Sequence, residues 1–67
     1  MTTETISPRI LRLPEVQSKT GLPRSAVYEL MSKGDFPKNV KLGPRAVGWD
    51  SREIDAWIRG KLSQRRA

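Results

Sequence analysis

Apolar residues are spaced as on one face of a helix in two parts of the chain, and they alternate with polar residues between these parts. Val27, Leu30 and Met31 stand three and four residues apart in RSAVYELMSK, and the spacing returns from Ile54 to Leu62. Between them, apolar and polar positions alternate along VKLGPRAVGW, residues 40–49. The pattern therefore predicts a helix, a β-hairpin and another helix.

A further short helix is predicted immediately before the first of these. The segment PEVQSKT opens with Pro14, which suits the first helical position, and ends at Gly21. Pro23 opens the next helix almost at once, and Gly34 ends it. The linking turn over residues 20–22 is too short to lay the two helices antiparallel, so they must cross steeply in a helix-turn-helix arrangement. The preceding RILRL is expected to be extended.

The hairpin and the last helix carry their own local signals. A Gly-Pro pair at 43–44 marks the hairpin turn, and Asp50 suits the N-cap of the last helix. Asp55 and Arg59 stand four residues apart and predict an ion pair on that helix. A hairpin that follows a helix-turn-helix is a wing. The predicted fold is therefore mainly α with a small β-hairpin: a winged helix-turn-helix of three helices plus the wing.

One shared core accounts for most of the large apolar residues, and both tryptophans are expected to pack inside it rather than stack on a base. Its predicted members are Leu13, Val16, Leu22, Val27, Leu30, Met31, Phe36, Val40, Leu42, Val47, Trp49, Ile54, Trp57 and Ile58.

Composition narrows the function. The 67 residues allow one domain with a marginal core, and they include no cysteine and no histidine. The chain therefore lacks thiolate ligands, imidazole bases and a likely place for a deep catalytic cleft, so we expect no enzyme, no metal and no cofactor. Within the chain we expect a flexible N-terminal arm (1–9), the winged domain (10–62) and a basic C-terminal tail (63–67).

Charge points to the class of partner. Thirteen Lys and Arg against seven Asp and Glu give a net charge of +6, which attracts polyanions such as nucleic acid. No apolar run approaches the roughly 20 residues of a membrane span, so no membrane partner is expected. The start, MTTETISPRI, lacks the basic and apolar regions of a secretory signal, and we therefore expect a protein of the bacterial cytoplasm and nucleoid.

Six residues are candidate DNA contacts. With Val27 facing the core, Arg24, Ser25 and Tyr28 are expected to point outward together at the start of the second helix, where a recognition helix meets base edges. Arginine bonds guanine bidentately, and serine and tyrosine suit phosphate oxygens. Along the hairpin, the candidates are Lys38, Lys41 and Arg45. An arginine at a narrow hairpin tip can reach phosphates or a minor groove. The alternative is that these charges only keep an edge strand from aggregating, which would not explain an arginine at the tip.

One long stretch of the sequence resembles a known family. The stretch RLPEVQSKTGLPRSAVYELMSKGDFPKNVKLGPRAVGWDSREIDAWI, residues 12–58, is similar to the AlpA-type prophage regulators, which group with excisionases and MerR-like winged helix-turn-helix domains. The resemblance implies sequence-specific DNA binding at phage or mobile-element loci. It places Arg24, Ser25 and Tyr28 on the recognition helix, and Lys41 and Arg45 on the wing. Pro23 is a departure, because family members often carry a serine there.

The leading hypothesis is a transcriptional regulator that binds double-stranded DNA. An architectural excisionase, binding repeated sites and bending DNA, is the alternative within the same class. A protein-interaction module is the alternative outside it, and would tolerate loss of Arg24 and Arg45. Self-association on DNA, and contacts with RNA polymerase or an integrase, stay open at this stage.

Overall fold

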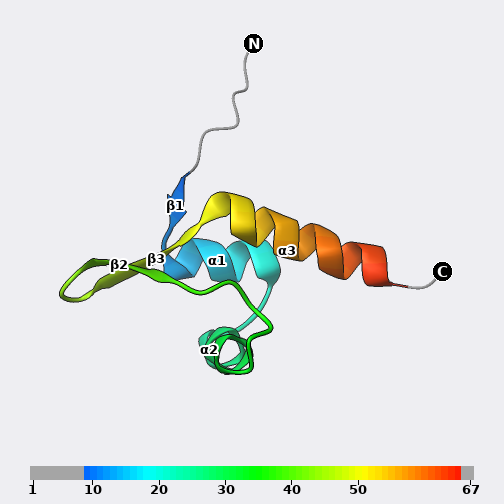
Figure 1. Cartoon of the computed structure of the whole chain (residues 1–67), viewed down its shortest axis with the longest axis horizontal. Coiled ribbons are helices and arrows are strands. Elements are labelled where there is room, and N and C mark those ends of the chain that lie inside the picture. The colour runs from blue at the N-terminus through cyan, green and yellow to red at the C-terminus, as the bar shows by residue number, and fades with distance from the viewer. Residues whose placement is uncertain (1–8, 66–67) are drawn as a thin grey trace, which may run out of the picture.

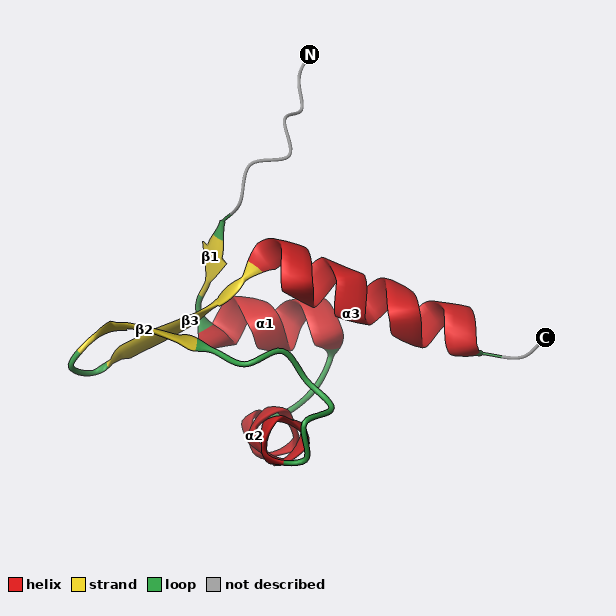
Figure 2. Cartoon of the chain, viewed as in Figure 1, coloured by secondary structure: helices red, strands yellow, loops and turns green. Residues whose placement is uncertain are grey.

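The computed structural model describes residues 9–65, and residues 1–8 and 66–67 lie outside the described part. Of the predicted arm only Arg9 is described, and of the predicted tail only residues 63–65. Helices and a small sheet share this part of the chain (Figures 1 and 2), which confirms the predicted fold class. Their order is β1 (Ile10–Leu11), α1 (Leu13–Thr20), α2 (Arg24–Ser32), β2 (Val40–Gly43), β3 (Ala46–Asp50) and α3 (Ser51–Gln64).

The connection between α1 and α2 has the predicted form. Gly21 adopts a left-handed conformation with φ of 76°, and its N–H donates to the Gln17 carbonyl at 2.7 Å, which closes α1. Pro23 then takes an extended conformation as the N-cap of α2, and its carbonyl accepts the Val27 N–H at 3.1 Å. Such a tight turn forces the steep crossing visible in Figure 1, where α2 is seen end-on and α1 lies across the view.

The sheet has one strand more than the hairpin. Its order is β1-β3-β2, and both neighbours run antiparallel to β3. Leu11 of β1 pairs with Trp49, while Lys41 of β2 pairs with Val47. RILRL was expected to be extended, but its pairing with β3 could not be foreseen, because two residues carry no periodicity. The β2–β3 hairpin extends away from the helices at the left of Figure 1 and forms the wing.

The start of α3 is capped and tied to β1. The Asp50 carboxylate accepts the Arg52 N–H at 2.8 Å, which confirms the predicted N-cap. The buried Ser51 donates its N–H to the Arg9 carbonyl at 2.8 Å, and its hydroxyl accepts the Arg9 N–H at 3.0 Å. The predicted ion pair within α3 is wrong: Asp55 binds Lys19 of α1 at 3.0 Å.

The core lies where α1, α2 and α3 meet the inner face of the sheet. Its fully buried side chains are Leu11, Val16, Val27, Phe36, Trp49 and Ile54, with Leu13, Leu22, Tyr28, Leu30, Met31, Val47, Trp57 and Ile58 packed partly against them. Both tryptophans pack as predicted. The Trp49 Nε1–H donates to the Pro37 carbonyl at 3.2 Å, and the Trp57 Nε1–H donates to the Asp35 carbonyl at 2.7 Å. These two bonds anchor the loop between α2 and β2.

Two core predictions are wrong and one core residue was missed. Val40 and Leu42 are 47% and 44% exposed, because Val40 pairs with Gly48, on the side of the sheet opposite Val47 and Trp49. Leu11, by contrast, is buried opposite Trp49. The apolar residues of the two hairpin strands therefore face opposite sides of the sheet.

Candidate nucleic-acid interface

The first turns of α2 present two exposed side chains and one that is half-buried. Val27 faces the core, which leaves Arg24 and Ser25 exposed as predicted. Tyr28 was expected to point outward with them, but its ring packs edge-on against Trp49 with centroids 6.3 Å apart. The Arg24 guanidinium lies 5.3 Å from the Tyr28 ring centroid, within range of a cation–π interaction. The Tyr28 ring thus helps to hold the Arg24 guanidinium in position.

A shallow concavity of about 560 Å³ lies between α1, α2 and the wing, and we call it the arginine cleft. It brings together Arg24 and Tyr28 from α2 with Arg45 from the wing turn, three of the six predicted contacts. Its full lining is Arg12, Leu13, Pro14, Arg24, Tyr28, Arg45 and Val47, which includes three cations and no carboxylate. The cleft is therefore a concentrated positive surface.

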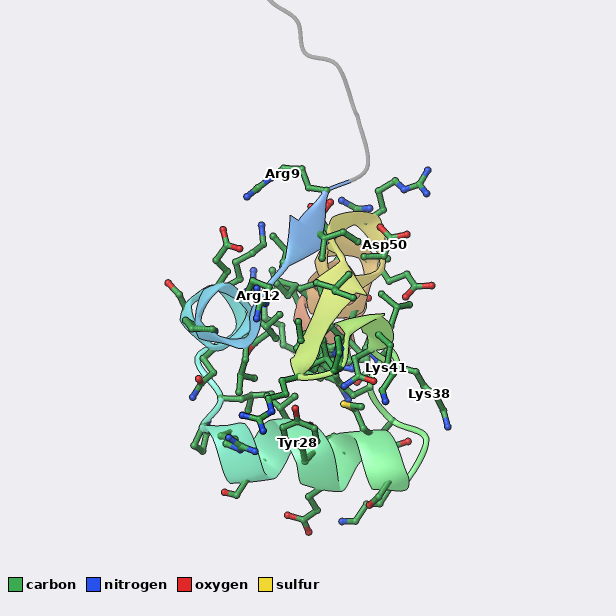
Figure 3. All side chains as sticks on the ribbon, turned by 90° about the vertical axis from the view of Figure 1, so that its left-hand side faces the viewer. Arg9, Arg12, Tyr28, Lys38, Lys41 and Asp50 are labelled. Atoms are coloured by element: carbon green, nitrogen blue, oxygen red, sulfur yellow. The ribbon has the colours of Figure 1, made fainter. Side chains whose placement is uncertain are left out.

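The remaining three predicted residues are not part of this lining. Ser25 is exposed on α2 next to Arg24. Lys41 pairs with Val47 in the sheet, so its side chain shares the face that borders the cleft. Lys38 is set apart: it lines a different groove with α3, and in Figure 3 it extends away from Arg12 on the opposite side of the molecule.

Arg12 is the residue that sequence reasoning missed. It follows β1 directly and precedes α1, and Figure 3 shows it above Tyr28, on the α1 side of the hairpin. Alternation in RILRL indicates only that Arg12 leaves the core when Leu11 faces it, and does not place Arg12 beside the wing. Using that signal requires knowing that β1 pairs with β3, which the local pattern does not reveal.

Ion pairs occupy acidic side chains elsewhere on the described surface. Glu29 of α2, whose charge would otherwise oppose phosphate near the recognition helix, binds Lys33 at 3.3 Å. Within residues 9–65, no ion pair includes an arginine of the cleft; the pairs are Arg9–Glu15, Lys19–Asp55, Lys33–Glu29 and Arg52–Asp50. Exposed pairs of this kind add little stability. Because they neutralise cations elsewhere, the arginines of the cleft keep their positive charge uncompensated.

Glu15, the carboxylate closest in sequence to Arg12, is directed at backbone rather than at the cleft. It accepts the Arg12 N–H at 3.2 Å and binds the Arg9 guanidinium at 3.1 Å. The hydrogen bond from the Arg12 N–H, and next the bond from Arg9, lower the pKa of Glu15 below its ordinary value of 4.5. Glu15 is therefore ionised at neutral pH, and its hydrogen bond with the Arg12 N–H fixes the backbone position of Arg12.

Residues 9–65 contain no group of three or more acidic, histidine or cysteine side chains placed to hold a metal ion. In the same range, no helix is long and apolar enough to cross a bilayer.

The helix-turn-helix, the wing and the basic cleft between them define a winged helix-turn-helix protein. Residues 9–62 match the family model described as the prophage CP4-57 regulatory protein (AlpA). The chain belongs to this AlpA family of prophage regulators, as the sequence resemblance predicted.

Two relatives illustrate the family. Over 58 residues the chain is 47% identical to the uncharacterized protein ORF88 of Enterobacteria phage P4, which covers 87% of this chain and 66% of that protein. The chain thus spans slightly less than two thirds of that relative. Over 56 residues it is 44% identical to the DNA-binding transcriptional activator AlpA of Escherichia coli K12, which covers 75% of this chain and 80% of that protein.

Proposed function

We propose that this protein is a sequence-specific DNA-binding transcriptional regulator of a prophage or mobile element, acting in the bacterial cytoplasm. The observation that carries the proposal is the arginine cleft, which joins the start of α2 to the wing with three cations and no carboxylate. A relative 44% identical to this chain is named a DNA-binding transcriptional activator, which supports the same class.

In the proposed complex, the first turns of α2 enter the major groove and the wing lies on the backbone or in the minor groove. The major groove admits an α-helix, and the N-terminal residues of a recognition helix meet the base edges. Arg24 and Ser25 are the exposed side chains there. Tyr28 holds Arg24 in place and offers its hydroxyl to a phosphate, while Lys41 and Arg45 anchor the wing. Lys38 contributes through long-range charge, because it lines a different groove.

Footprinting tests this proposal on DNA fragments from around the protein's own gene and any neighbouring integrase gene. At ~150 mM salt we expect a discrete footprint, and with about six phosphates neutralised the logarithm of affinity should fall against log salt with a slope near −5. Arg24→Ala should weaken the specific site by about 1–3 kcal/mol and unrelated DNA much less. Arg59→Ala is the matched control, because Arg59 is exposed on α3 and lines neither groove. Uniform binding of every fragment, or none, contradicts the proposal.

The excisionase alternative uses the same surface, so DNA shape must separate it from regulation. Each copy presents one α2 and one wing. Either role therefore calls for several copies on adjacent sites when stable specific binding is needed. A circular-permutation bending assay distinguishes the two: an unbent complex beside a promoter favours the regulator, and a strongly bent complex on repeats near an attachment site favours the excisionase.

A further inference from the structure

We propose that the arginine cleft binds one DNA backbone phosphate, and that Arg12 and Arg45 are its contact residues, while Arg24 adds positive charge to the cleft and reaches toward a base edge. The identity of the ligand as DNA rests on the proposed function. The chemical class, a phosphodiester anion, rests on the cleft itself. Neither the recognition helix nor the wing contains Arg12, so this contact adds a third element, the β1–α1 junction, to the interface.

Charge is the first argument. Three arginines line the same concavity from the β1–α1 junction, α2 and the wing turn, and no carboxylate lines it. No ion pair among residues 9–65 includes any of the three. Like charges held in one concavity repel each other, and a bound anion relieves that repulsion. The larger groove beside α3 lacks this property, because its lining mixes Lys38 and Lys61 with Asp35 and Glu53.

Positioning is the second argument. The backbone of Arg12 is fixed on both sides: its N–H donates to Glu15, and its carbonyl accepts the Val16 N–H at 3.0 Å. Tyr28 holds the guanidinium of Arg24 over its ring. A fixed backbone at Arg12 and a ring beneath the Arg24 guanidinium reduce the entropy lost on binding an anion. The cleft is also lined by Leu13, Pro14 and Val47, which offer an anion no competing acceptor side chain.

Guanidinium chemistry is the third argument. Its planar fork of N–H donors matches the oxygens of a phosphate in a bidentate arrangement, which an ammonium group does not reproduce. The forks of Arg12 and Arg45 at one shallow concavity suit a backbone phosphate that passes between the recognition helix and the wing. Arg12 belongs to neither the recognition helix nor the wing, the two elements proposed to enter the grooves. Arg12 is therefore assigned to affinity and register rather than to sequence discrimination.

The test compares Arg12→Ala, Arg12→Lys and the control Arg59→Ala on two duplexes, one footprinted and one of unrelated sequence. We expect Arg12→Ala to weaken both duplexes by the same factor, about tenfold, and to reduce the salt slope by about 0.9. Arg12→Lys should keep the wild-type slope with intermediate affinity, because it keeps the charge and loses the fork. Arg59→Ala should change affinity about twofold or less, since it removes only distant charge.

Wild-type protein provides a readout that needs no variant to fold. The Arg12 Nε–H resonance, followed by NMR, should shift when the unrelated duplex is added, and the Arg59 resonance should stay in place. Equal effects of Arg12→Ala and Arg59→Ala, or an unmoved Arg12 resonance in the bound state, overturn the proposal. Because a phosphate contact is independent of sequence, absence of a footprint would refute the regulator and leave this test intact. A footprint combined with unchanged DNA binding of Arg12→Ala would support the regulator and refute the phosphate contact.

Discussion

At Gly48, even the methyl side chain of alanine is expected to disturb the packing of β1 against β3. A Cβ added there would overlap Cγ2 of Ile10 and would lie 3.1 Å from Cδ1 of Leu42 and 3.2 Å from the carbonyl oxygen of Leu11. The Leu42 side chain is partly exposed and can move aside. The Leu11 oxygen belongs to the backbone of β1, so relieving that contact requires β1 to shift from β3.

Two opposing effects set the size of the change caused by Gly48→Ala. Replacing a glycine restricts the unfolded chain and stabilises by about 0.4–1 kcal/mol where the native conformation permits alanine. Overpacking in a closed space costs about 1–3 kcal/mol. The cost exceeds the gain at Gly48, so we expect a net loss of about 1–2 kcal/mol. For a domain of this size, that loss lowers Tm by about 4–16 °C.

Thermal unfolding followed by circular dichroism measures the loss directly, and Gly43→Ala is the matched control. Gly43 lies in the same hairpin with nothing within 4 Å of an added Cβ and without a positive φ. Its substitution should therefore leave Tm unchanged or raise it slightly. Ile10→Ala should restore part of the loss in the Gly48→Ala background, since the two side chains compete for one space. Equal Tm values for the two glycine variants would refute the packing argument.

Three further results are expected. Ser51→Ala removes the hydroxyl that accepts the Arg9 N–H and should lower the free energy of unfolding by about 1 kcal/mol in urea denaturation; an unchanged midpoint would mean that water replaces the hydroxyl. Glu15 and Asp50 each accept a backbone N–H, which lowers the pKa of both carboxyls below their ordinary values. A depressed pKa stabilises the fold above the unfolded-state value, so stability should hold near neutrality and decrease as pH falls below about 4.5; a Tm that is flat down to pH 3 would contradict this. Tyr28→Phe keeps the aromatic contacts and removes the hydroxyl, so Tm should stay nearly constant while DNA affinity falls about threefold to tenfold in a binding titration; unchanged affinity would assign Tyr28 to support alone.

Local signals in the sequence were sufficient for the helices, their crossing and the hairpin. A left-handed glycine, a proline at a helix start and a carboxylate N-cap act on their nearest neighbours, so Gly21, Pro23 and Asp50 could be interpreted without the rest of the fold. Pro23 also shows what the departure from serine costs, since α2 has no side-chain hydrogen bond at its N-cap.

The sheet could not be interpreted in this way, because its faces depend on pairing between distant residues. Alternation in β2 placed Val40 and Leu42 on one face and Lys41 on the other, but gave no sign of which face was buried. The register with β3 decides it, and it puts Lys41 beside Val47. The same limitation hid Arg12, and with it one third of the cations in the arginine cleft.

The pairing of β1 with β3 links the order of folding to the order of synthesis. The hydrogen bonds of α1, α2 and the hairpin join residues that are close in sequence, but helices of 8 and 9 residues are marginal alone and need the core for stability. β1 precedes all these elements, yet its partner β3 follows both helices and β2, and closing that loop costs entropy that only the completed sheet offsets. Until then Leu11 stays exposed and Arg12 has no fixed place beside the wing. An incomplete chain therefore lacks an assembled arginine cleft, and the proposed contact with DNA requires the whole domain.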